Sequence, residues 1–419
     1  LPGVTSLCLV QSQARDLAPL AAMSRLATLE LRECPNVADL APLARLSNLS
    51  SLRLDWTDAF DLAPLASLRK LACLRVCESS ALSDLAPLAE LSGLVLLDLS
   101  GCAEVADLAP LTKLARLKSL QLRGENAPLA VADLAPIAGL TGLTSLDLTG
   151  CTKVRGFAAL ERLAELVSLR LPVRADTGLA FLEKLPKLAT IELRAEIALG
   201  PDEPTARPAS LAPLARLSRL TALSLPSASD DQLQLVAGIA SLTSLEIWDG
   251  ADLTSLAPLA KLANLTALRL GPCPAVTDLA PLAKLTKLAT LELGHCEKVA
   301  DLAPIGTLVG LHTLGLTGWG TLPAIEPLGR LANLATLDFS WSGGLTDLAP
   351  VGGLRTLRSL ALVGCTGVTD LKPLARLPNL ARLDLNGCEE VSDLSPLAGM
   401  SNLSALRLRA CPKLADITP

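Results

Sequence analysis

The chain has 419 residues, of which 50% are hydrophobic and only 2% aromatic, and tyrosine is absent. A formal net charge of −5 provides no basic field to attract nucleic acid or an anionic membrane, so neither partner is expected. No run of about 18 uninterrupted apolar residues occurs, which argues against a membrane span. Leucine and alanine must therefore supply the core, a composition that suits many thin, identical layers.

A unit of the form LxxLxLxxC, followed by xxVxDLAPLAxL, runs from one end of the chain to the other. Its LxL core, or a close variant, recurs eighteen times, with a spacing of 22 or 23 residues almost throughout. Because side chains alternate between the two faces of a strand, each core predicts a short strand. The predicted strand cores are residues 7–9, 29–31, 52–54, 74–76, 97–99, 120–122, 146–148, 169–171, 191–193, 223–225, 245–247, 268–270, 291–293, 314–316, 337–339, 360–362, 383–385 and 406–408.

The segment TLELG shows how one such strand is built. Leu291 and Leu293 are expected to enter the core, whereas Thr290, Glu292 and Gly294 face outward. Similar strands then stack about 4.8 Å apart into one parallel sheet.

The DLAPL segment that follows most strands predicts a short helical turn. In residues 39–43, Asp39 is placed to cap the turn, and Pro42 falls in the first turn, where its missing N–H costs little. Eleven repeats keep DLxP followed by Leu, Ile or Val. Because helical turns and strands occupy different widths, the stack is expected to curve, with the sheet on its concave face.

These motifs resemble leucine-rich repeats, whose pattern is L-x-x-L-x-L-x-x-N/C. The outer D-[LI]-x-P-L form is similar to the bacterial internalin-like type, and the cysteine is similar to that of the cysteine-containing repeat class. The resemblance covers essentially the whole chain and implies an α/β solenoid shaped as a curved horseshoe, with about 18 repeats. Residues 1–419 then form a single array, and because both ends fall inside a repeat, we expect a fragment of a longer protein.

Eight of the eleven cysteines occupy one repeat position, three residues after the strand core. They are Cys34, Cys102, Cys151, Cys273, Cys296, Cys365, Cys388 and Cys411. Neighbouring side chains in such a ladder should run parallel, so we expect buried, reduced thiols rather than disulfides, which favours a cytoplasmic setting. Cys296 should then face the core and His295 the solvent, so this adjacent pair does not predict a nucleophile and its base.

The common catalytic motifs are missing from the sequence. It contains no GxxxxGK[ST], HExxH or GxSxG, and no GxGxxG after a strand. Cys73 and Cys77 stand roughly 13 Å apart along one strand, too far to share a metal ion. We therefore expect neither an enzyme nor a cofactor or metal site.

The outward strand positions differ between two parts of the chain. From residue 30 to 194 they carry charges of both signs, which either keep the face soluble through cross-strand pairs or contact a partner of alternating charge. Between residues 246 and 341 most charge is lost and rings appear. Because aromatic side chains are common hot spots at protein interfaces, the candidate partner-binding residues are Trp248, Glu292, His295, Trp319 and Trp341. The alternative is that rings fill gaps where cysteine is missing, since Trp319 stands at the cysteine position itself.

The middle of the array, residues 171–235, departs from the pattern. The strand cores 191–193 and 223–225 lie 32 residues apart, so residues 195–210 are predicted to protrude as a loop. Its charged residues Asp202, Glu203 and Arg207 are further candidate contacts, because insertions often mark a binding edge, although neutral drift explains such a loop equally well. Pro172 and Pro226 fall just after predicted strands, so regular curvature is expected to change locally.

These features favour a non-enzymatic recognition domain for a protein ligand, bound on the concave face or the insertion edge. Segments such as GCTKVRGFAAL and GCTGVTDLKPLARL look like the arrays attached C-terminally to bacterial NACHT- or STAND-type ATPases. That resemblance implies an NLR-like defence or signalling sensor whose N-terminal effector or ATPase domain lies outside this chain. The alternatives are an internalin-like adhesive ectodomain and a scaffold or substrate-binding arm of an effector complex.

Overall fold

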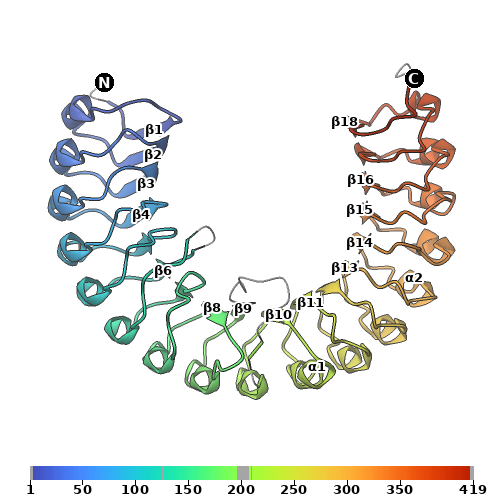
Figure 1. The fold of residues 1–419 in the computed structure, drawn as a ribbon, viewed down its shortest axis with the longest axis horizontal. Coiled ribbons are helices and arrows are strands. Elements are labelled where there is room, and N and C mark those ends of the chain that lie inside the picture. The colour runs from blue at the N-terminus through green and yellow to red at the C-terminus, as the bar shows by residue number, and fades with distance from the viewer. Residues whose placement is uncertain (1–2, 125–126, 196–206, 209, 416–419) are drawn as a thin grey trace. The chain divides into compact units, whose positions relative to one another are not determined.

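The computed structural model describes residues 3–124, 127–195, 207–208 and 210–415. It divides into two compact units, Leu1–Leu220 (unit 1) and Thr221–Pro419 (unit 2). Each unit is built from one repeated element, a short strand followed by a short helix (Figure 1). Asp202 and Glu203, predicted as contacts on the insertion, lie outside the described residues.

Within its described residues, unit 1 contains nine of the strands and nine short 3-10 helices. The strands are β1 (Ser6–Val10), β2 (Thr28–Cys34), β3 (Ser51–Thr57), β4 (Cys73–Cys77), β5 (Leu96–Asp98), β6 (Ser119–Gln121), β7 (Ser145–Asp147), β8 (Ser168–Val173) and β9 (Thr190–Ala195). The helices are η1 (Ala18–Ala22), η2 (Ala41–Arg45), η3 (Ala63–Ser67), η4 (Ala86–Glu90), η5 (Ala109–Lys113), η6 (Ala135–Gly139), η7 (Ala158–Arg162), η8 (Ala180–Lys184) and η9 (Ala212–Arg216).

Unit 2 repeats the arrangement, with two of its short helices in the α form. Its strands are β10 (Ala222–Ser227), β11 (Ser244–Asp249), β12 (Ala267–Pro272), β13 (Thr290–Gly294), β14 (Thr313–Thr317), β15 (Thr336–Asp338), β16 (Ser359–Ala361), β17 (Arg382–Asp384) and β18 (Ala405–Arg407). Its helices are α1 (Asp230–Val236), η10 (Ala257–Lys261), η11 (Ala280–Lys284), α2 (Ala303–Gly306), η12 (Glu326–Arg330), η13 (Val351–Gly353), η14 (Lys372–Arg376) and η15 (Ser395–Leu397).

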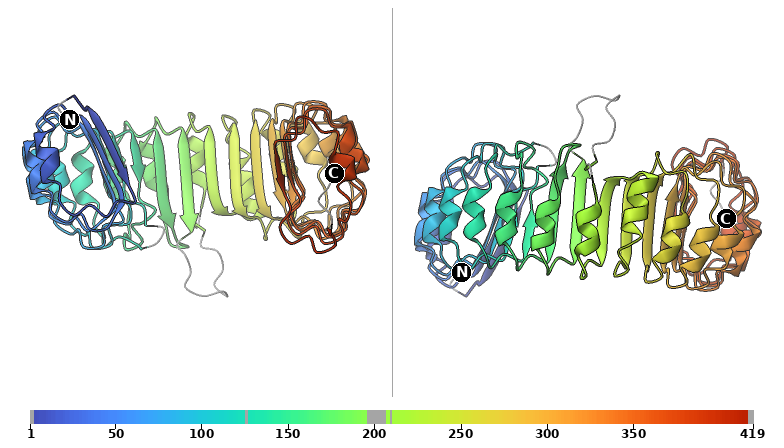
Figure 2. Two further views of the ribbon diagram at one scale, coloured as in Figure 1. Left: turned by 90° about the horizontal axis from the view of Figure 1, so that it is seen from above. Right: turned by 90° about the horizontal axis from the view of Figure 1, so that it is seen from below.

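The fold is a leucine-rich repeat solenoid, with 18 parallel strands and short helical turns between them, as the repeats predict. Each predicted strand core overlaps one of the strands in the structure. In each unit the strands lie side by side on one face and the helices on the opposite face (Figure 2). Equivalent core residues are in register: Leu29 is paired with Leu52, and Leu291 with Leu314. Each of these leucines is fully buried.

The DLxP segment forms the predicted capped turn. Oδ1 of Asp39 accepts a hydrogen bond of 2.8 Å from the N–H of Ala41, and Pro42 lies in the first turn of η2. The same aspartate bond recurs in all eleven repeats that keep the motif, at Asp16, Asp39, Asp61, Asp84, Asp107, Asp133, Asp278, Asp301, Asp347, Asp370 and Asp393. A side-chain oxygen thus satisfies one of the N–H groups that every helix start leaves without a backbone partner.

The cysteines form the ladder that their spacing predicts. Seven of the eight ladder cysteines are buried, Cys411 is half-buried, and every cysteine in the chain is a free thiol. The thiols bond to main-chain carbonyls, often across one repeat: Sγ of Cys102 donates to the carbonyl of Val76 at 3.1 Å, and Sγ of Cys365 to that of Phe339 at 3.1 Å. Ser342 occupies the same position, and its Oγ donates to the carbonyl of Leu316 at 3.1 Å. The inward side chain thus satisfies a carbonyl at the bend.

The region around residues 171–235 keeps its strands. Pro172 and Pro226 are predicted just after strands, but they lie within β8 and β10, which extend further than their cores. Pro172 stays in register with Arg194 on β9, because a proline tolerates extended backbone near a strand end. The main change is α1, where Ser229 and Gln232 form a reciprocal capping box in place of DLxP. Among the described residues, no helix has the length and apolar character to cross a membrane.

Candidate functional site

A column of left-handed residues follows the strands of unit 2, directly before the ladder position. His295 and Trp341 adopt positive φ values of 48° and 64°, as do the glycines Gly318 (71°), Gly364 (67°) and Gly387 (74°). This conformation costs an L-residue roughly 1–2 kcal/mol, which favours glycine, but the fold also imposes it on other residues at this position, including Ala410 in unit 2 and Trp56 and Glu78 in unit 1. It turns the side chain at this position away from the core.

The two rings of this column lie flat on neighbouring glycines. A Cβ atom added to Gly364 would stand only 2.5 Å from Cε3 of Trp341, and one added to Gly318 only 2.4 Å from Cε1 of His295. Each ring therefore uses the space that a glycine leaves in the next repeat. His295 is exposed, and Trp341 is 67% exposed. The backbone thus holds both rings in place while their outer faces stay accessible.

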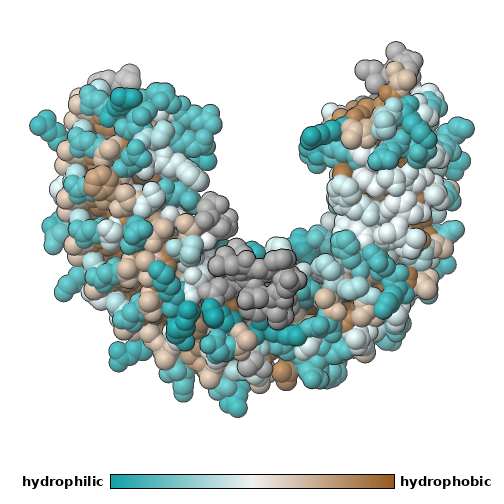
Figure 3. Space-filling model, in the orientation of Figure 1, coloured by the Kyte–Doolittle hydropathy of each residue, from teal (hydrophilic) through white to brown (hydrophobic). Residues whose placement is uncertain are grey.

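Trp248 and Glu292 lie on the same strand face of unit 2. Trp248 is within β11 and 47% exposed, and its Nε1 donates to Oγ of Ser224 at 3.0 Å. Glu292 on β13 forms an ion pair of 3.1 Å with Arg269 of β12 and packs against Gly315 of β14. We call Trp248, Glu292, His295 and Trp341 the aromatic strip. Figure 3 shows a pale area of intermediate hydropathy on the strand side of unit 2 near β14–β16.

The prediction that Trp319 contacts a partner is wrong. Its side chain is fully buried, and its Nε1 donates to the carbonyl of Leu293 at 2.9 Å. Trp319 therefore replaces a ladder cysteine, filling the slot with a ring and making the same kind of cross-repeat bond. Of the insertion residues, only Arg207 is described, and it is half-buried.

The charged strand face of unit 1 pairs across strands. Asp147 on β7 accepts ion pairs from Arg123 at 3.4 Å and from Arg170 on β8 at 3.3 Å, and Arg170 also reaches Glu192 on β9 at 2.8 Å. Such pairs are the first of the two interpretations of this face, in which opposite charges on neighbouring strands neutralise one another. Asp147 is only 4% exposed, so this pairing also compensates the cost of burying its carboxylate.

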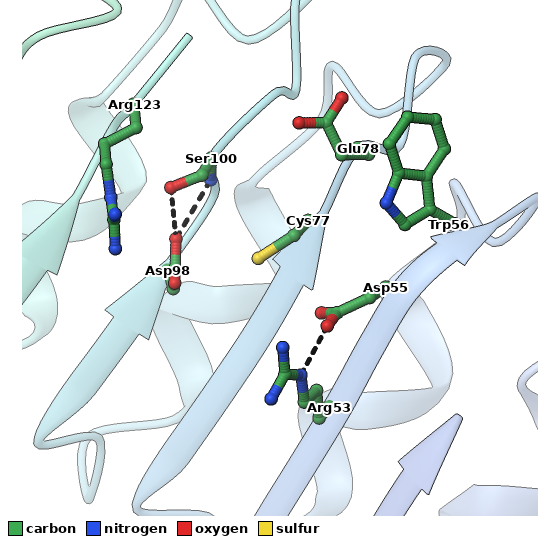
Figure 4. A pocket seen from close by; sticks show the side chains of 8 residues that line it. All are labelled: Arg53, Asp55, Trp56, Cys77, Glu78, Asp98, Ser100 and Arg123. Atoms are coloured by element: carbon green, nitrogen blue, oxygen red, sulfur yellow. Dashed lines mark hydrogen bonds and ion pairs between the residues drawn. The ribbon is translucent and has the colours of Figure 1, made fainter. Parts of the chain in front are cut away.

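A pocket of about 270 Å³ opens on the same face, around the ends of β3–β5 (Figure 4). We call it the acidic pocket, and it is lined by Arg53, Asp55, Trp56, Cys77, Glu78, Asp98, Ser100 and Arg123. In Figure 4 the Cys77 thiol lies between the carboxylates of Asp55 and Asp98, and the indole of Trp56 stands beside Glu78. These charges are evident in the sequence, but the pocket is not predicted from it. The sequence feature that could have indicated the pocket is Trp56, a tryptophan directly after the outward-facing Asp55.

The surroundings of the thiol in this pocket disfavour its ionisation. Burial, and after it the negative charges of Asp98 and Asp55, raise the pKa of Cys77 far above its ordinary value. The pKa of Cys296, the neighbour of His295, is also strongly raised, by a hydrogen bond with Cys273 and then by burial. A thiolate nucleophile needs the opposite shift. Among the described residues, no group of three or more His, Cys, Asp or Glu side chains is placed to hold a metal ion.

No family model matches this chain, and no curated protein matches it either. Solved structures do match. The leucine-rich repeat protein LIC12759 of Leptospira interrogans is 18% identical, with coverage of 94% of this chain and 98% of that one, and a TM-score of 0.63. The mouse RP105/MD-1 complex is 18% identical over 93% of this chain and 76% of that one, with a TM-score of 0.56. The TLR13–ssRNA13 complex is 19% identical over 93% and 65%, with a TM-score of 0.51.

The repeat geometry and these likenesses show that the chain has the leucine-rich repeat fold. Its fold is shared with a bacterial leucine-rich repeat protein over nearly the whole length of both chains. Identities below 25% establish the fold alone, and a fold does not by itself define a function.

Proposed function

We propose that the chain is a non-enzymatic protein-recognition domain and that the aromatic strip of unit 2 contacts the partner. The observation that carries this proposal is Trp341, an indole that is 67% exposed and held by a left-handed backbone on Gly364. A large ring exposed to water at a conformational cost has no evident role in the core. Tryptophan in a fixed position is also the residue type most enriched among interface hot spots.

The neighbouring residues fit a protein surface better than a small molecule. Trp248 and His295 add two further exposed rings, and the ion pair between Glu292 and Arg269 supplies polar groups beside them. Trp248, His295 and Trp341 are all exposed, so the strip presents its rings to the solvent. Open surfaces with aromatic anchors and a polar rim are typical of protein interfaces.

The finer proposal is the sensor array of a bacterial NLR-like protein acting in the cytoplasm, joined to an N-terminal effector or ATPase domain. The similarity of GCTKVRGFAAL to such arrays supports it, as do the free thiols of the ladder, which suit a reducing compartment. An internalin-like adhesin and a scaffold of an effector complex are the alternatives. The sequence upstream in the gene distinguishes them: a Walker motif supports the sensor, a signal peptide the adhesin, and a ligase or toxin domain the scaffold.

A photo-crosslinking experiment tests the surface. A benzoylphenylalanine placed at position 341 should give a discrete protein adduct in native cells, whereas one at Val309, which is 56% exposed and follows α2, should not. In an affinity capture without a crosslinker, the double variant Trp248→Ala and Trp341→Ala should lose the protein that the wild-type chain retains. This variant should remain folded, with a free energy of unfolding lowered by about 1 kcal/mol, because the contacts of the Trp341 ring with Gly364 are lost. An unchanged capture would remove the strip from the interface.

A further inference from the structure

The acidic pocket of unit 1 is formed by side chains from β3, β4 and β5, from the turns after β4 and β5, and from Arg123, which follows β6. Its lining holds three carboxylates, those of Asp55, Glu78 and Asp98, against the two guanidinium groups of Arg53 and Arg123. The formal charge of the lining is therefore −1. The raised pKa of Cys77, to which both aspartates contribute after burial, agrees with a negative potential at the pocket floor.

One carboxylate of the pocket is incompletely satisfied. The Asp55 side chain is 9% exposed; its Oδ2 is paired with Nε of Arg53, but its Oδ1 is buried without a hydrogen-bond partner. A buried acceptor left in this state costs about 1–3 kcal/mol, and more when it is charged. On Asp98, the N–H and Oγ of Ser100 both donate to Oδ1, so Oδ2 takes no part in these bonds. Both aspartates thus have an oxygen left for a donor.

The two arginines of the lining are already engaged within the chain. Nε of Arg53 pairs with Asp55, Nη2 of Arg123 donates to Oε1 of Gln121 at 2.9 Å, and Nε of Arg123 faces Asp147 at 3.4 Å. An anion entering the pocket would compete for these guanidinium groups and meet three carboxylates. A cation would meet Oδ1 of Asp55 and Oδ2 of Asp98, the two acceptor oxygens that the bonds within the pocket do not use. Nε of Arg123 is also buried without a hydrogen-bond partner, so it is the lining's formal charge of −1 and the buried Oδ1 of Asp55 that favour a positive group.

Trp56 supplies the remaining element of a cation site. It has a positive φ of 54° and is 53% exposed, so its indole projects at the rim of the pocket beside Glu78 (Figure 4). An indole face attracts a cation by about 0.5–1 kcal/mol at exposed sites and more where water is excluded. Its apolar surface also suits the methylene stem of a long side chain.

We propose that the acidic pocket binds a cationic side chain, the guanidinium or ammonium group of an arginine or lysine presented by a protein partner. Asp55 and Asp98 accept from the cation, and Trp56 covers its stem. The site lies wholly within unit 1 and does not depend on the aromatic strip. The pocket can therefore fail its test while the proposed function stands, and the reverse is also true.

The test uses the full chain labelled with 5-fluorotryptophan, whose four tryptophans give four ¹⁹F signals. The probes are the blocked peptides Gly-Arg-Gly, Gly-Lys-Gly, Gly-Gln-Gly and Gly-Glu-Gly. The Arg and Lys peptides should shift the Trp56 signal in a saturable manner and leave the buried Trp319 unchanged. This shift should weaken with added salt, because the contact is ionic. Equal shifts with the Gln peptide, or stronger binding of the Glu peptide, would overturn the proposal without any variant.

Two variants sharpen the result. Asp55→Asn keeps the size of the side chain and removes its charge, and it should weaken the affinity for the Arg peptide about tenfold. Asp384→Asn is the matched control, since Asp384 is also a strand carboxylate paired with an arginine, Arg407 at 3.1 Å, but lies in unit 2. The Trp319 signal reports whether each variant is folded. Affinity that is unchanged in a folded Asp55→Asn protein would refute the site.

Discussion

The packing of the Trp341 ring on Gly364 leads to a prediction: replacing glycine by alanine should have different effects at two similar positions. Gly364 and Gly387 both have left-handed φ values, of 67° and 74°, so an alanine at either position pays the same backbone cost. That cost is roughly 1–2 kcal/mol, partly offset because alanine also restricts the unfolded chain by about 0.4–1 kcal/mol. Each substitution should therefore lower the free energy of unfolding by about 1 kcal/mol from this cause.

The two positions differ in what their new methyl group meets. At Gly364 the Cβ would stand 2.5 Å from Cε3 and 2.8 Å from Cζ3 of Trp341, so the indole has to move away from this residue. At Gly387 the nearest atom is the amide nitrogen of Gly364 at 3.3 Å, and no ring is displaced. Gly364→Ala should therefore cost about 1 kcal/mol more than Gly387→Ala, from the lost contacts of the ring.

The assay combines urea unfolding with the ¹⁹F signal of 5-fluorotryptophan at position 341. Gly364→Ala should move or broaden this signal and reduce capture of the protein that crosslinks at position 341, whereas Gly387→Ala should do neither. If Gly387→Ala disturbs the Trp341 signal as much as Gly364→Ala does, the ring does not rest on Gly364, and the reasoning for a preformed strip fails.

Two further predictions concern the thiols. In the folded protein the exposed Cys8 should react with a maleimide at once, and Cys296 only after denaturation; rapid labelling of Cys296 under native conditions would contradict its place in the core. Burial raises the pKa of Cys365 from 9.0 to about 11, so the folded thiol keeps its proton where the unfolded one loses it. Stability from this thiol is complete below pH 9 and falls as the pH rises toward 11, by up to about 1.4 kcal/mol per pH unit. Cys365→Ser introduces at this ladder position the residue type that Ser342 has at the equivalent one. Between pH 8 and 10, the free energy of unfolding of this variant, measured with urea, should fall by about 1 kcal/mol less than that of the wild type. Equal losses would refute the raised pKa of Cys365.

The strands and turns could be predicted because each position recurs in many repeats. Asp39, for example, is one of eleven aspartates in the same motif, and all eleven make the same bond. The ladder could be predicted for the same reason, since the side chain three residues after the core is buried in most of the described repeats. Repetition thus converts a weak local signal into a strong one.

The candidate site could be predicted only in part, because it depends on single residues rather than on the repeat. Trp319 and Trp341 both follow a strand closely, yet one fills the ladder slot and the other stands one residue before it, where the backbone turns left-handed. That offset of one residue was readable in the sequence and decides which ring is buried. The acidic pocket was not readable, because it depends on how far side chains on separate strands, such as Asp55 and Asp98, reach toward one another.

The bonds of the cysteine ladder have a mechanical consequence. Cys365, Cys388 and Cys411 each donate to a carbonyl 26 residues earlier, so each of these three residues ties its repeat to the one before it. A force that pulls on one end of the stack loads these ties in series, and the outermost one fails first. Under tension the array should therefore lengthen in discrete steps, each releasing one repeat of 22 or 23 residues, about 75 Å of slack chain.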